Sequence, residues 1–453
     1  FSAAGKIPGG YYKREGKPTD KEVLTGRLID RALRPLFPAN FFHSVQIVNT
    51  VYSVDKEHVP STLALIASSL ALSISRIPFQ EPVAVVEMAR LGGKWVVNPV
   101  YADAIKADSK LIVAGTIDGI CMVEGCTSEI LEQEFIDTMF MAHEHIKMLV
   151  SWQLQIQKEI GAPKQDVSKD FKFDWSLWEQ RVDALLTSEN LIALFIADKL
   201  VRNDKIQLLR DTLITQFSTE IKENGVEQTV VDYIFDTRLR AKIVDMNFVL
   251  DKRIDNRSFD QVREITVDIG LLPFTHGSAL FTRGRTQALV SATLGSGQDE
   301  QRIEELMENG ELAGNFMLHY NFLPFSTGEA RPMRGPGRRE IGHGYLAASA
   351  IRNILPSKED FPYTIRIVSD ILESDGSSSM ATTCGATMAL MHAGVPIKAV
   401  VSGIAMGLLM NEQGNFKILS DICGSEDEFG LMDFKVTGTQ TGITAIQMDI
   451  KHK

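Results

Sequence analysis

Cysteine is scarce in this chain of 453 residues, and the few cysteines form no recognisable ligand pattern. Cys121, Cys126, Cys384 and Cys423 include no CxxC pair and no Cys/His spacing of the kind that binds a metal. We therefore expect reduced, mostly buried thiols, as in a cytosol-like compartment. Long apolar runs are also missing, and no signal-peptide pattern follows Phe1, so we expect no membrane-spanning segment.

Basic residues are not in excess either. The chain holds 47 Lys and Arg against 58 Asp and Glu, a formal net charge of −11. This balance argues against a protein coated with nucleic acid over its whole surface, but it leaves room for a narrow basic channel. The length is too great for one ordinary core and predicts two or three domains.

The most informative feature present is an internal repeat. Under a shift of 318 positions, identical residues coincide without a gap: Glu22 with Glu340, Gly26 with Gly344, Arg34 with Arg352, Pro38 with Pro356, Ser61 with Ser379 and Pro78 with Pro396. A shift of 323 brings VAGT at 113–116 onto VTGT at 436–439. Gly and Pro mark turns and helix ends, so their coincidence at fixed spacing indicates a duplicated fold. We predict two copies of one α/β core.

The two copies are separated by a stretch of different composition. Strand patterns fade after Lys164, and Lys/Asp/Glu-rich helical patterns take over until about Asp255. The predicted domains are a first core at 1–162, an all-helical domain at 163–255 and a second core at 256–453.

The repeat also predicts that sequence is missing at both ends. Residue 319 is the counterpart of Phe1, and the second copy starts near residue 257, so about 319 − 257 = 62 residues of the first copy are expected to precede this sequence. At the other end, we expect the second copy to lack its closing helix. A chain that begins at Phe1 also looks like a piece of a longer protein.

Local patterns predict most of the regular elements. A capping box of Thr19 and Glu22 predicts a helix that ends before Pro35. The other predicted elements are a strand at 45–54, a buried helix at 61–75, a hairpin at 82–99, two strands within 109–125, a helix at 130–160 and a hairpin at 275–295. Arg283 and Gly284 are expected at the turn of the last hairpin, either as a purely structural turn or with a substrate role.

Ser420–Thr439 combines an acidic loop with a short strand. The acidic side chains of the loop are Asp421, Glu426, Asp427 and Glu428, and the strand-like run holds Asp433, Phe434 and Lys435. Residues two apart on a strand point to the same face, so Asp433 and Lys435 are expected to project together. With Asp427 they are suited to hold a divalent metal and a charged substrate. The alternative is a solvated acidic loop beside a surface ion pair.

A second constellation lies in Glu373–Pro396. Ser377, Ser378 and Ser379 follow Gly376 and lead into a predicted helix. Free N–H groups at a helix start, hydroxyls and a glycine that allows close approach are suited to bind an oxyanion such as phosphate. The alternative is a serine-rich helix cap.

Two helix starts carry clustered arginines. Arg338, Arg339 and His343 begin a helix of the second copy, and they lie where the first copy has Arg27, Arg31 and Arg34 on one helix face. Three like charges on one face are unfavourable unless an anion lies opposite. The alternatives are a solvated basic face and, for His343, a buried structural histidine.

The copies differ in these chemical groups. Asp433 aligns with Lys110 and Lys435 with Ile112, while Ser377 and Ser378 align with Val59 and Pro60. Only the second copy is therefore equipped for chemistry, which suggests that the first serves assembly or binding.

The sequence resembles the polynucleotide phosphorylase family from end to end. The resemblance rests on FSAAGKIPGGYYKREGKPTDKEVLTGRLIDRALRPLFP, HGSALFTRGRTQALV, RREIGHG, ESDGSSSMA and MDFKVTGTQTGITAIQMDIK, in the order of that family. It implies an α/β (α+β) fold with two ribonuclease PH-like cores, of the ribosomal protein S5 domain 2-like kind, joined by an all-helical domain. It also implies a homotrimeric ring around a channel for single-stranded RNA. The KH and S1 RNA-binding domains of the family are absent from this sequence.

The resemblance also implies an activity and its residues. The expected reaction is processive, reversible 3′-to-5′ phosphorolysis of RNA to nucleoside diphosphates, with inorganic phosphate as co-substrate and Mg²⁺ or Mn²⁺ as cofactor. Asp427, Asp433 and Lys435 look like the catalytic set, with Asp427 and Asp433 on the metal. Ser377, Ser378, Ser379, Arg338, Arg339 and His343 resemble the phosphate and backbone contacts. Tyr11, Tyr12, Lys13, Arg14, Arg27, Arg31 and Arg34 fall where the family binds RNA.

The sequence departs from the family pattern at one position, and two other functions remain as alternatives. Ser425 stands where many members have an acid, which implies one carboxylate fewer near the metal. The alternatives are a non-catalytic RNA-binding ring scaffold and a hydrolytic metal-dependent 3′ exonuclease. The resemblance further implies mRNA degradation in a bacterial cytoplasm, in preference to an organelle matrix, and possible partners in an RNA-degradation complex with an endoribonuclease and a helicase. No membrane partner is expected.

Overall fold

A computed structural model describes residues 1–451 except 10, 168–173, 224–226 and 309–310. By their contacts, these residues form two compact units. The first unit comprises Phe1–Gln165, Arg263–Ala405 and Phe434–Lys453, and the second comprises Asp166–Val262 and Met406–Asp433. Both copies of the repeat contribute to the first unit. The three predicted domains are consecutive segments of the sequence, whereas these two units are defined by contacts in space. The division into three domains therefore stays a prediction.

The repeat predicted from the sequence reappears in the element boundaries. Helices α1 (Asp20–Leu33) and α10 (Arg338–Arg352) begin 318 residues apart, and so do α2 (Pro60–Ile74) and α11 (Ser378–His392). Strands β3 (Ser109–Gly115) and β14 (Met432–Gly438) are related by the shift of 323. The predicted capping box is also present, because Thr19 and Glu22 exchange hydrogen bonds at the start of α1.

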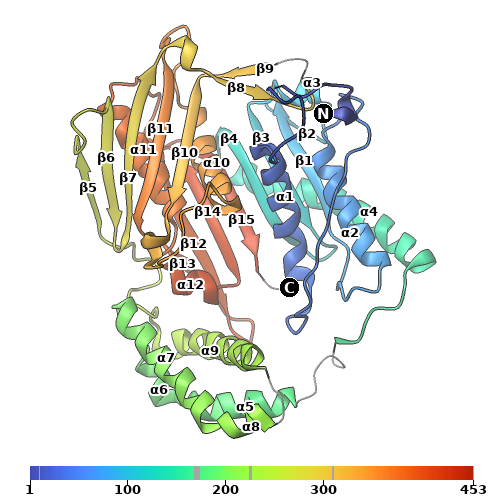
Figure 1. Cartoon of the computed structure of the whole chain (residues 1–453), viewed down its shortest axis with the longest axis vertical. Helices are drawn as coiled ribbons and strands as arrows, with labels where there is room; N and C mark the ends of the chain where they lie inside the picture. Colours follow the sequence, from blue (N-terminus) through green and yellow to red (C-terminus); the bar gives the residue numbers. More distant parts are fainter. Residues whose placement is uncertain (10, 168–173, 224–226, 309–310, 452–453) are drawn as a thin grey trace. The chain divides into compact units, whose positions relative to one another are not determined.

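A five-stranded sheet lies in the first unit, in the order β10-β11-β7-β6-β5. β10 and β11 are parallel, and the other pairs are antiparallel. Helix α11 packs on β6 and β7, and α10 packs on β10 (Figure 1). Apolar side chains of alternate strand positions, such as Phe281, Val290 and Ile367, are buried under these helices. The strands are β5 (Ile265–Ile269), β6 (Gly277–Arg283), β7 (Thr286–Gly295), β10 (Phe316–Phe322) and β11 (Thr364–Glu373).

An eight-stranded sheet has the order β13-β12-β14-β15-β4-β3-β1-β2. Its β15–β4 pairing, with Met448 opposite Val123, joins the second copy to the first by backbone hydrogen bonds. Long helix α4 (Glu132–Ile160) packs on the first-copy strands. The remaining strands are β1 (Ala84–Leu91), β2 (Lys94–Val97), β4 (Ile120–Ile130), β12 (Ser402–Met410), β13 (Phe416–Ser420) and β15 (Ile443–Ile450). The strands, hairpins and helices predicted at 61–75, 82–99, 109–125, 130–160 and 275–295 are confirmed.

The strand predicted at 45–54 is wrong, because these residues form no regular element and belong to no sheet. Their counterpart under the shift of 318 is β11, which is paired with β10 and β7. The counterpart of β7 would carry numbers below 1, outside this sequence. A β-branched segment forms a strand only when neighbouring backbone groups are available for pairing, and this segment has no second strand beside it.

The helices of the second unit have their own core. Trp178, Val182, Phe235 and Ile243 are buried there, together with Cys423 from the second-copy segment. The helices are α5 (Trp175–Leu185), α6 (Ser188–Ile192), α7 (Lys199–Gln216), α8 (Ser218–Glu223), α9 (Gln228–Leu250) and α12 (Gly424–Phe429). The predicted helical character of the region between the cores is confirmed for its described residues.

Shorter elements complete the chain. They are α3 (Tyr101–Ala104), the 3₁₀ turns η1 (Ser2–Ala4), η2 (Arg34–Leu36), η4 (Gly297–Asp299) and η5 (Pro324–Thr327), and the paired strands β8 (Gln301–Glu304) and β9 (Glu311–Gly314). Within the part of the chain that the structure describes, no helix is both long and apolar enough to cross a membrane.

Candidate active site

The serine run begins α11 with an unusual backbone. Ser377 caps the helix at φ +54°, directly after Gly376 at φ +87°. The hydroxyl oxygens of Ser377 and Ser379 are buried, and neither has a hydrogen-bond partner among the described residues. A buried hydroxyl without a partner is costly, so these two groups are suited to receive an oxyanion at the start of the helix.

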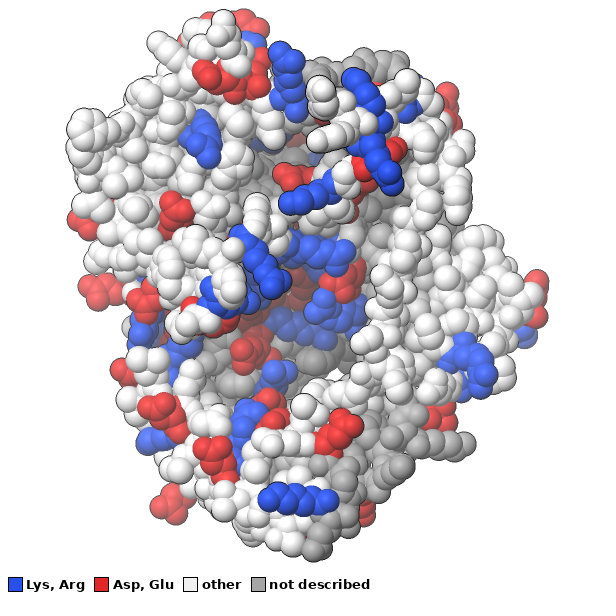
Figure 2. All heavy atoms as spheres, viewed as in Figure 1, with Lys and Arg blue, Asp and Glu red and all other residues white. Residues whose placement is uncertain are grey.

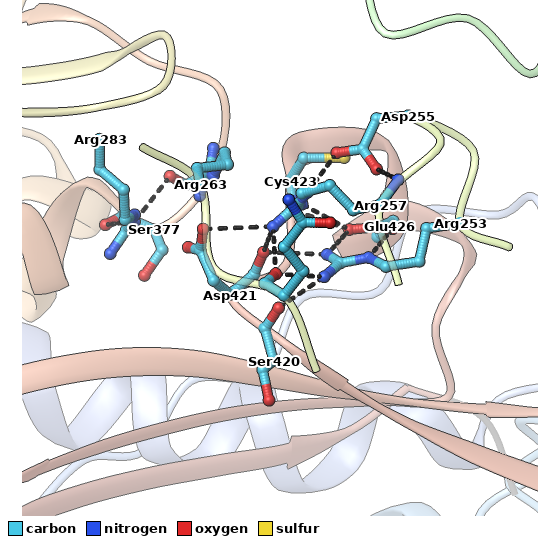
Figure 3. Close-up of polar contacts among 12 residues, drawn as sticks. Arg253, Asp255, Arg257, Arg263, Arg283, Ser377, Ser420, Asp421, Cys423 and Glu426 are labelled. Atoms are coloured by element: carbon cyan, nitrogen blue, oxygen red, sulfur yellow. Dashed lines mark hydrogen bonds and ion pairs between the residues drawn. The ribbon is translucent and has the colours of Figure 1, made fainter. Parts of the chain in front are cut away.

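The loop before α11 is held by its carbonyl groups. Arg283 donates to the Ser377 carbonyl at 3.0 Å, and the Thr286 hydroxyl donates to the Gly376 carbonyl at 3.0 Å. Arg263 donates to the Asp375 carbonyl at 2.6 Å (Figure 3). These bonds fix the backbone of the loop, and they leave the hydroxyls of Ser377 and Ser379 without a partner among the described residues. Arg283 thus holds the serine loop as well as ending a hairpin strand.

Tyr320 on β10 links two of the predicted site residues. Its buried hydroxyl lies 2.7 Å from Ser378 Oγ and 3.3 Å from His343 Nδ1. Burial raises the pKa of Tyr320, so it keeps its proton and stays available as a hydrogen-bond donor. Burial, together with the charges of Lys435 and Arg339, holds the pKa of His343 well below its usual value of 6.5. His343 is therefore a neutral imidazole at neutral pH. Sequence patterns did not point to Tyr320, which lies alone in an alternating strand.

Arginines from both copies meet where α1 approaches α10. The Arg27 side chain lies against Gly342, where any Cβ would overlap it, and Arg338 lies close to Gly26. Arg338 and Arg339 are exposed, whereas burial, followed by the charge of Arg31, lowers the pKa of Arg27. Figure 2 shows Lys and Arg side chains gathered over α1 and α10 on the face drawn. The glycines permit this close approach, and the gathered charge is suited to bind an anion.

The other two arginines of α1 have different surroundings. Arg31 is largely buried and pairs with Glu124 and with Asp449, whose Oδ1 lies 2.7 Å from Nε. Burial alone would lower the pKa of Arg31, but the two carboxylates raise it above its ordinary value. Arg34 is exposed and pairs with Asp30. The three arginines therefore do not present one uniform basic face.

Asp433 and Lys435 lie two residues apart on β14, and each is 8% exposed. The boundary between the two units falls between them. Asp427 lies on α12, so the segment predicted as an acidic loop is in part a short helix. Among the described residues, no three His, Cys, Asp or Glu side chains are grouped to hold a metal. Asp427 and Asp433 each offer carboxylate oxygens, the type of ligand that Mg²⁺ prefers.

The aromatic-basic loop lies at the surface of the first unit. Tyr11 and Tyr12 are 94% and 88% exposed, and their rings meet edge to face at 5.6 Å. Lys13 has φ +50°, and both Lys13 and Arg14 are exposed. Exposed rings beside cations are suited to stack bases and bind phosphates of a single strand.

Comparison with protein families and relatives agrees with this architecture. The model of the 3′ exoribonuclease family, domain 1, matches residues 1–78 and 261–396. The two stretches end 396 − 78 = 318 residues apart, which is the shift of the internal repeat. Among solved structures, rice (Oryza sativa) Rrp46 matches 43% of this chain and 84% of its own at 22% identity, with a TM-score of 0.35. The chain is an α/β protein whose two matched stretches are similar to the 3′ exoribonuclease domain and whose region between them is helical in its described residues.

The relatives specify the chain further. Polyribonucleotide nucleotidyltransferases of Gemmatimonas aurantiaca, Geotalea daltonii and Persephonella marina are each 47% identical to it over 99%, 99% and 100% of the chain. The chain is therefore similar over nearly its whole length to polyribonucleotide nucleotidyltransferases, enzymes also called polynucleotide phosphorylases. It spans 60%, 63% and 62% of the length of these relatives. The family resemblance seen in the motifs is confirmed.

Proposed function

We propose that this protein is a phosphorolytic 3′-to-5′ exoribonuclease that removes nucleotides from RNA as nucleoside diphosphates. The observation that carries the proposal is a pair of buried hydroxyls at the start of α11, those of Ser377 and Ser379, for which the described part of the chain provides no hydrogen-bond partner. A hydrolase has no need of an oxyanion pocket for the attacking group, whereas a phosphorolase does. Homology to polyribonucleotide nucleotidyltransferases supports the same reaction.

The proposed reaction exchanges one P–O bond for another. An oxygen of inorganic phosphate attacks the phosphorus of the 3′-terminal phosphodiester, and the bond from that phosphorus to the 3′ oxygen of the preceding ribose breaks. The proton that the attacking phosphate releases balances the one that the leaving 3′ oxygen takes up. The products are a nucleoside diphosphate and RNA shorter by one residue. No covalent bond to the protein is needed.

The proposed roles of the residues follow from their surroundings. Ser377 and Ser379 donate hydroxyl hydrogens to the attacking phosphate, and Ser378 and Tyr320 hold the loop in shape. Lys435 offsets the negative charge that develops on the phosphoryl oxygens. Neutral His343 serves as a hydrogen-bonding group, because the protonated form is disfavoured by burial. Arg338 and Arg339 bind phosphates of the RNA, together with Arg27.

Asp427 and Asp433 are proposed to hold Mg²⁺, for which Mn²⁺ can substitute. When bound, the ion would neutralise charge on the reacting phosphoryl oxygens. The two carboxylates supply hard oxygen ligands, which is the chemistry that Mg²⁺ requires.

The RNA path and the assembly are also part of the proposal. Tyr11, Tyr12, Lys13 and Arg14 are proposed to bind single-stranded RNA, and Arg34 lies on the exposed side of α1 for further phosphate contacts. Arg31 is proposed to act near the RNA path indirectly, through its pairs with Glu124 and Asp449. We also propose a homotrimeric ring in a bacterial cytoplasm, with possible partners in an RNA-degradation complex. Four cysteines that form no disulfide among the described residues, together with bacterial relatives, support this location.

A product assay tests the proposal. The protein is incubated with poly(A), Mg²⁺ and inorganic phosphate, and the products are separated by ion exchange. The proposal predicts ADP whose yield depends on phosphate. AMP that forms without phosphate would instead support the hydrolase, and RNA binding without any product would support the non-catalytic scaffold.

A further inference from the structure

A buried ion pair lies beneath α12, the helix that carries Asp427. Arg253 follows α9 and is fully buried, and Glu426 of α12 is 4% exposed. Arg253 Nε donates to Glu426 Oε1 at 2.7 Å, and its NH2 group pairs with the other carboxylate oxygen (Figure 3). This bidentate arrangement fixes the orientation of both side chains.

The same guanidinium also holds the turn that precedes α12. It donates to the carbonyl of Ser420 at 2.6 Å and to that of Asp421 at 2.9 Å. Asp421 has φ +54°, a left-handed conformation that is uncommon for residues other than glycine. Arg257 adds a second donor to the Asp421 carbonyl at 3.0 Å. Two arginines next to the helical region therefore set the path of the chain into α12.

Ser425 also contacts the helical region, through its side chain. Arg202 of α7 is 1% exposed, and it donates to Ser425 Oγ at 3.2 Å and to the Ile196 carbonyl at 2.6 Å. Cys423 is buried in the helical core, and Phe429 packs against it. Ser425 and Glu426, the two residues before Asp427, thus both have arginine partners within the second unit.

We propose that Arg253 and Glu426 are positioning residues, which hold α12 so that Asp427 is presented to the divalent metal, and that Glu426 is not a metal ligand. The inference rests on the proposed function only in taking Asp427 as a metal ligand. It assigns the helical region a part in building the metal site. It also implies that Ser425 does not deprive the site of a metal ligand, because an acid at this position would pair with Arg202.

Manganese binding tests the assignment directly. Mn²⁺ is titrated into the full 453-residue chain in the presence of inorganic phosphate, with a protein-free sample as the blank, and free ion is measured by electron paramagnetic resonance. Arg253→Lys removes the bidentate pair and most of the carbonyl bonds, and we expect Mn²⁺ to bind roughly 10- to 100-fold more weakly, as for other partners that orient metal ligands. If Glu426 were itself a metal ligand, Arg253→Lys would release its carboxylate from the ion pair, and Mn²⁺ would bind equally well or more tightly.

A second variant guards against a failure to fold. Arg253→Met combined with Glu426→Met removes both charges and leaves none unpaired in the interior. We expect a native circular dichroism spectrum with the same weakening of Mn²⁺ binding, and higher Mn²⁺ concentration should restore ADP formation. The KM for phosphate at saturating Mn²⁺ should not change, because the serine loop is untouched.

Two further variants serve as references. Asp183→Asn breaks a pair with Arg238 within the helices of the same unit, and it should leave Mn²⁺ binding as in wild type. Asp427→Asn should abolish specific binding. Wild-type Mn²⁺ affinity in both Arg253 variants would overturn the inference, and so would a wild-type chain that binds no Mn²⁺. A wild-type chain that binds Mn²⁺ but forms no ADP would contradict the proposed function alone.

Discussion

Tyr320 joins two groups that are far apart in the sequence, Ser378 and His343. Its hydroxyl makes the hydrogen bonds to both groups, while its ring packs edge to face with the His343 ring at 5.3 Å. The hydroxyl and the ring therefore have separable effects. The first fixes the serine loop, and the second fills the space beside α10.

Replacing Tyr320 by Phe separates the two effects. The ring stays in place, but Ser378 and His343 lose their common partner. The loss of one buried hydrogen bond costs about 1–1.5 kcal/mol, which corresponds to roughly a tenfold rise in the KM for phosphate. Steady-state phosphorolysis of poly(A) at varied phosphate measures this, with Tyr363→Phe at a half-exposed ring as the control. An unchanged KM would show that Tyr320 does not hold the phosphate loop.

The depressed pKa of His343 predicts a pH dependence of stability. Because the pKa in the folded state lies well below 6.5, the unfolded chain binds this proton more readily as the pH falls below 6.5. Stability is therefore fully present above that pH and is lost below it, by at most about 1.4 kcal/mol per pH unit. His343→Asn should flatten this loss between pH 7 and 5.5, as measured by urea unfolding of both proteins. Parallel curves for the two proteins would contradict the buried, neutral imidazole.

Single residues differ in how far the sequence reveals them. Ser377–Ser379 could be predicted because three hydroxyls after a glycine form a local pattern. Tyr320 and Arg253 could not, because their partners lie 58 and 173 residues away and only the fold brings them together. Helical spacing placed Arg27, Arg31 and Arg34 on one face, but it could not show that Glu124 and Asp449 hold Arg31.

At the scale of elements, the end of strand β8 is bonded to residues of the first copy. Lys6 donates to the Glu305 carbonyl at 2.7 Å, and the Gly9 N–H donates to Glu304 Oε2 at 3.1 Å. Lys21 of α1 pairs with the Glu305 carboxylate at 2.6 Å. These bonds hold the residues before Tyr11, so second-copy strands support the proposed RNA-binding loop of the first copy.

Gly9→Ala tests this support. A Cβ at Gly9 would overlap the Glu304 carboxylate, so the bond to the Gly9 N–H must break. One such bond is worth about 0.5–1.5 kcal/mol, and we expect the KM for poly(A) to rise about 3- to 10-fold with the KM for phosphate unchanged. Gly16→Ala is the matched control, because a Cβ there meets nothing within 4 Å. Equal effects of the two substitutions would show that the bond from Glu304 does not support the loop.

The positions of helices and strands could be predicted where a local sequence signal or the internal repeat marks them. Helix caps, Gly turns and the shifts of 318 and 323 predicted the positions of α1, α10, α11 and β14. The strand at 45–54 could not be judged in this way, because a strand depends on partners that sequence periodicity does not contain. The short helix α12 was also missed, since its acidic residues resemble a loop until Arg253 and the helical core are seen to hold it.

At the scale of the whole molecule, the two copies differ in the residues to which the proposal assigns the chemistry. The strands β3 and β14 are equivalent, yet Lys110 and Ile112 stand where β14 has Asp433 and Lys435. Both copies contribute to one sheet through β4 and β15. The first copy is therefore needed for structure and, in the proposal, for RNA binding.

Asp433→Ala separates assembly from chemistry. ADP release should fall below detection, because the proposed metal site loses one of its two carboxylates. The molecular mass in solution, by sedimentation equilibrium, should stay near three times 50.2 kDa, as proposed for the wild-type ring. Wild-type rates in an intact ring would contradict the assignment of Asp433, and a monomeric wild type would contradict the ring.

Isotopic labelling shows whether the attacking oxygen comes from inorganic phosphate or from water. Poly(A) is digested in the presence of ³²P-labelled inorganic phosphate, and the nucleotide products are separated and degraded to locate the label. Phosphorolysis predicts ADP with all of its label in the β-phosphate, because the terminal RNA phosphate becomes the α-phosphate. Unlabelled AMP as the product would contradict the account.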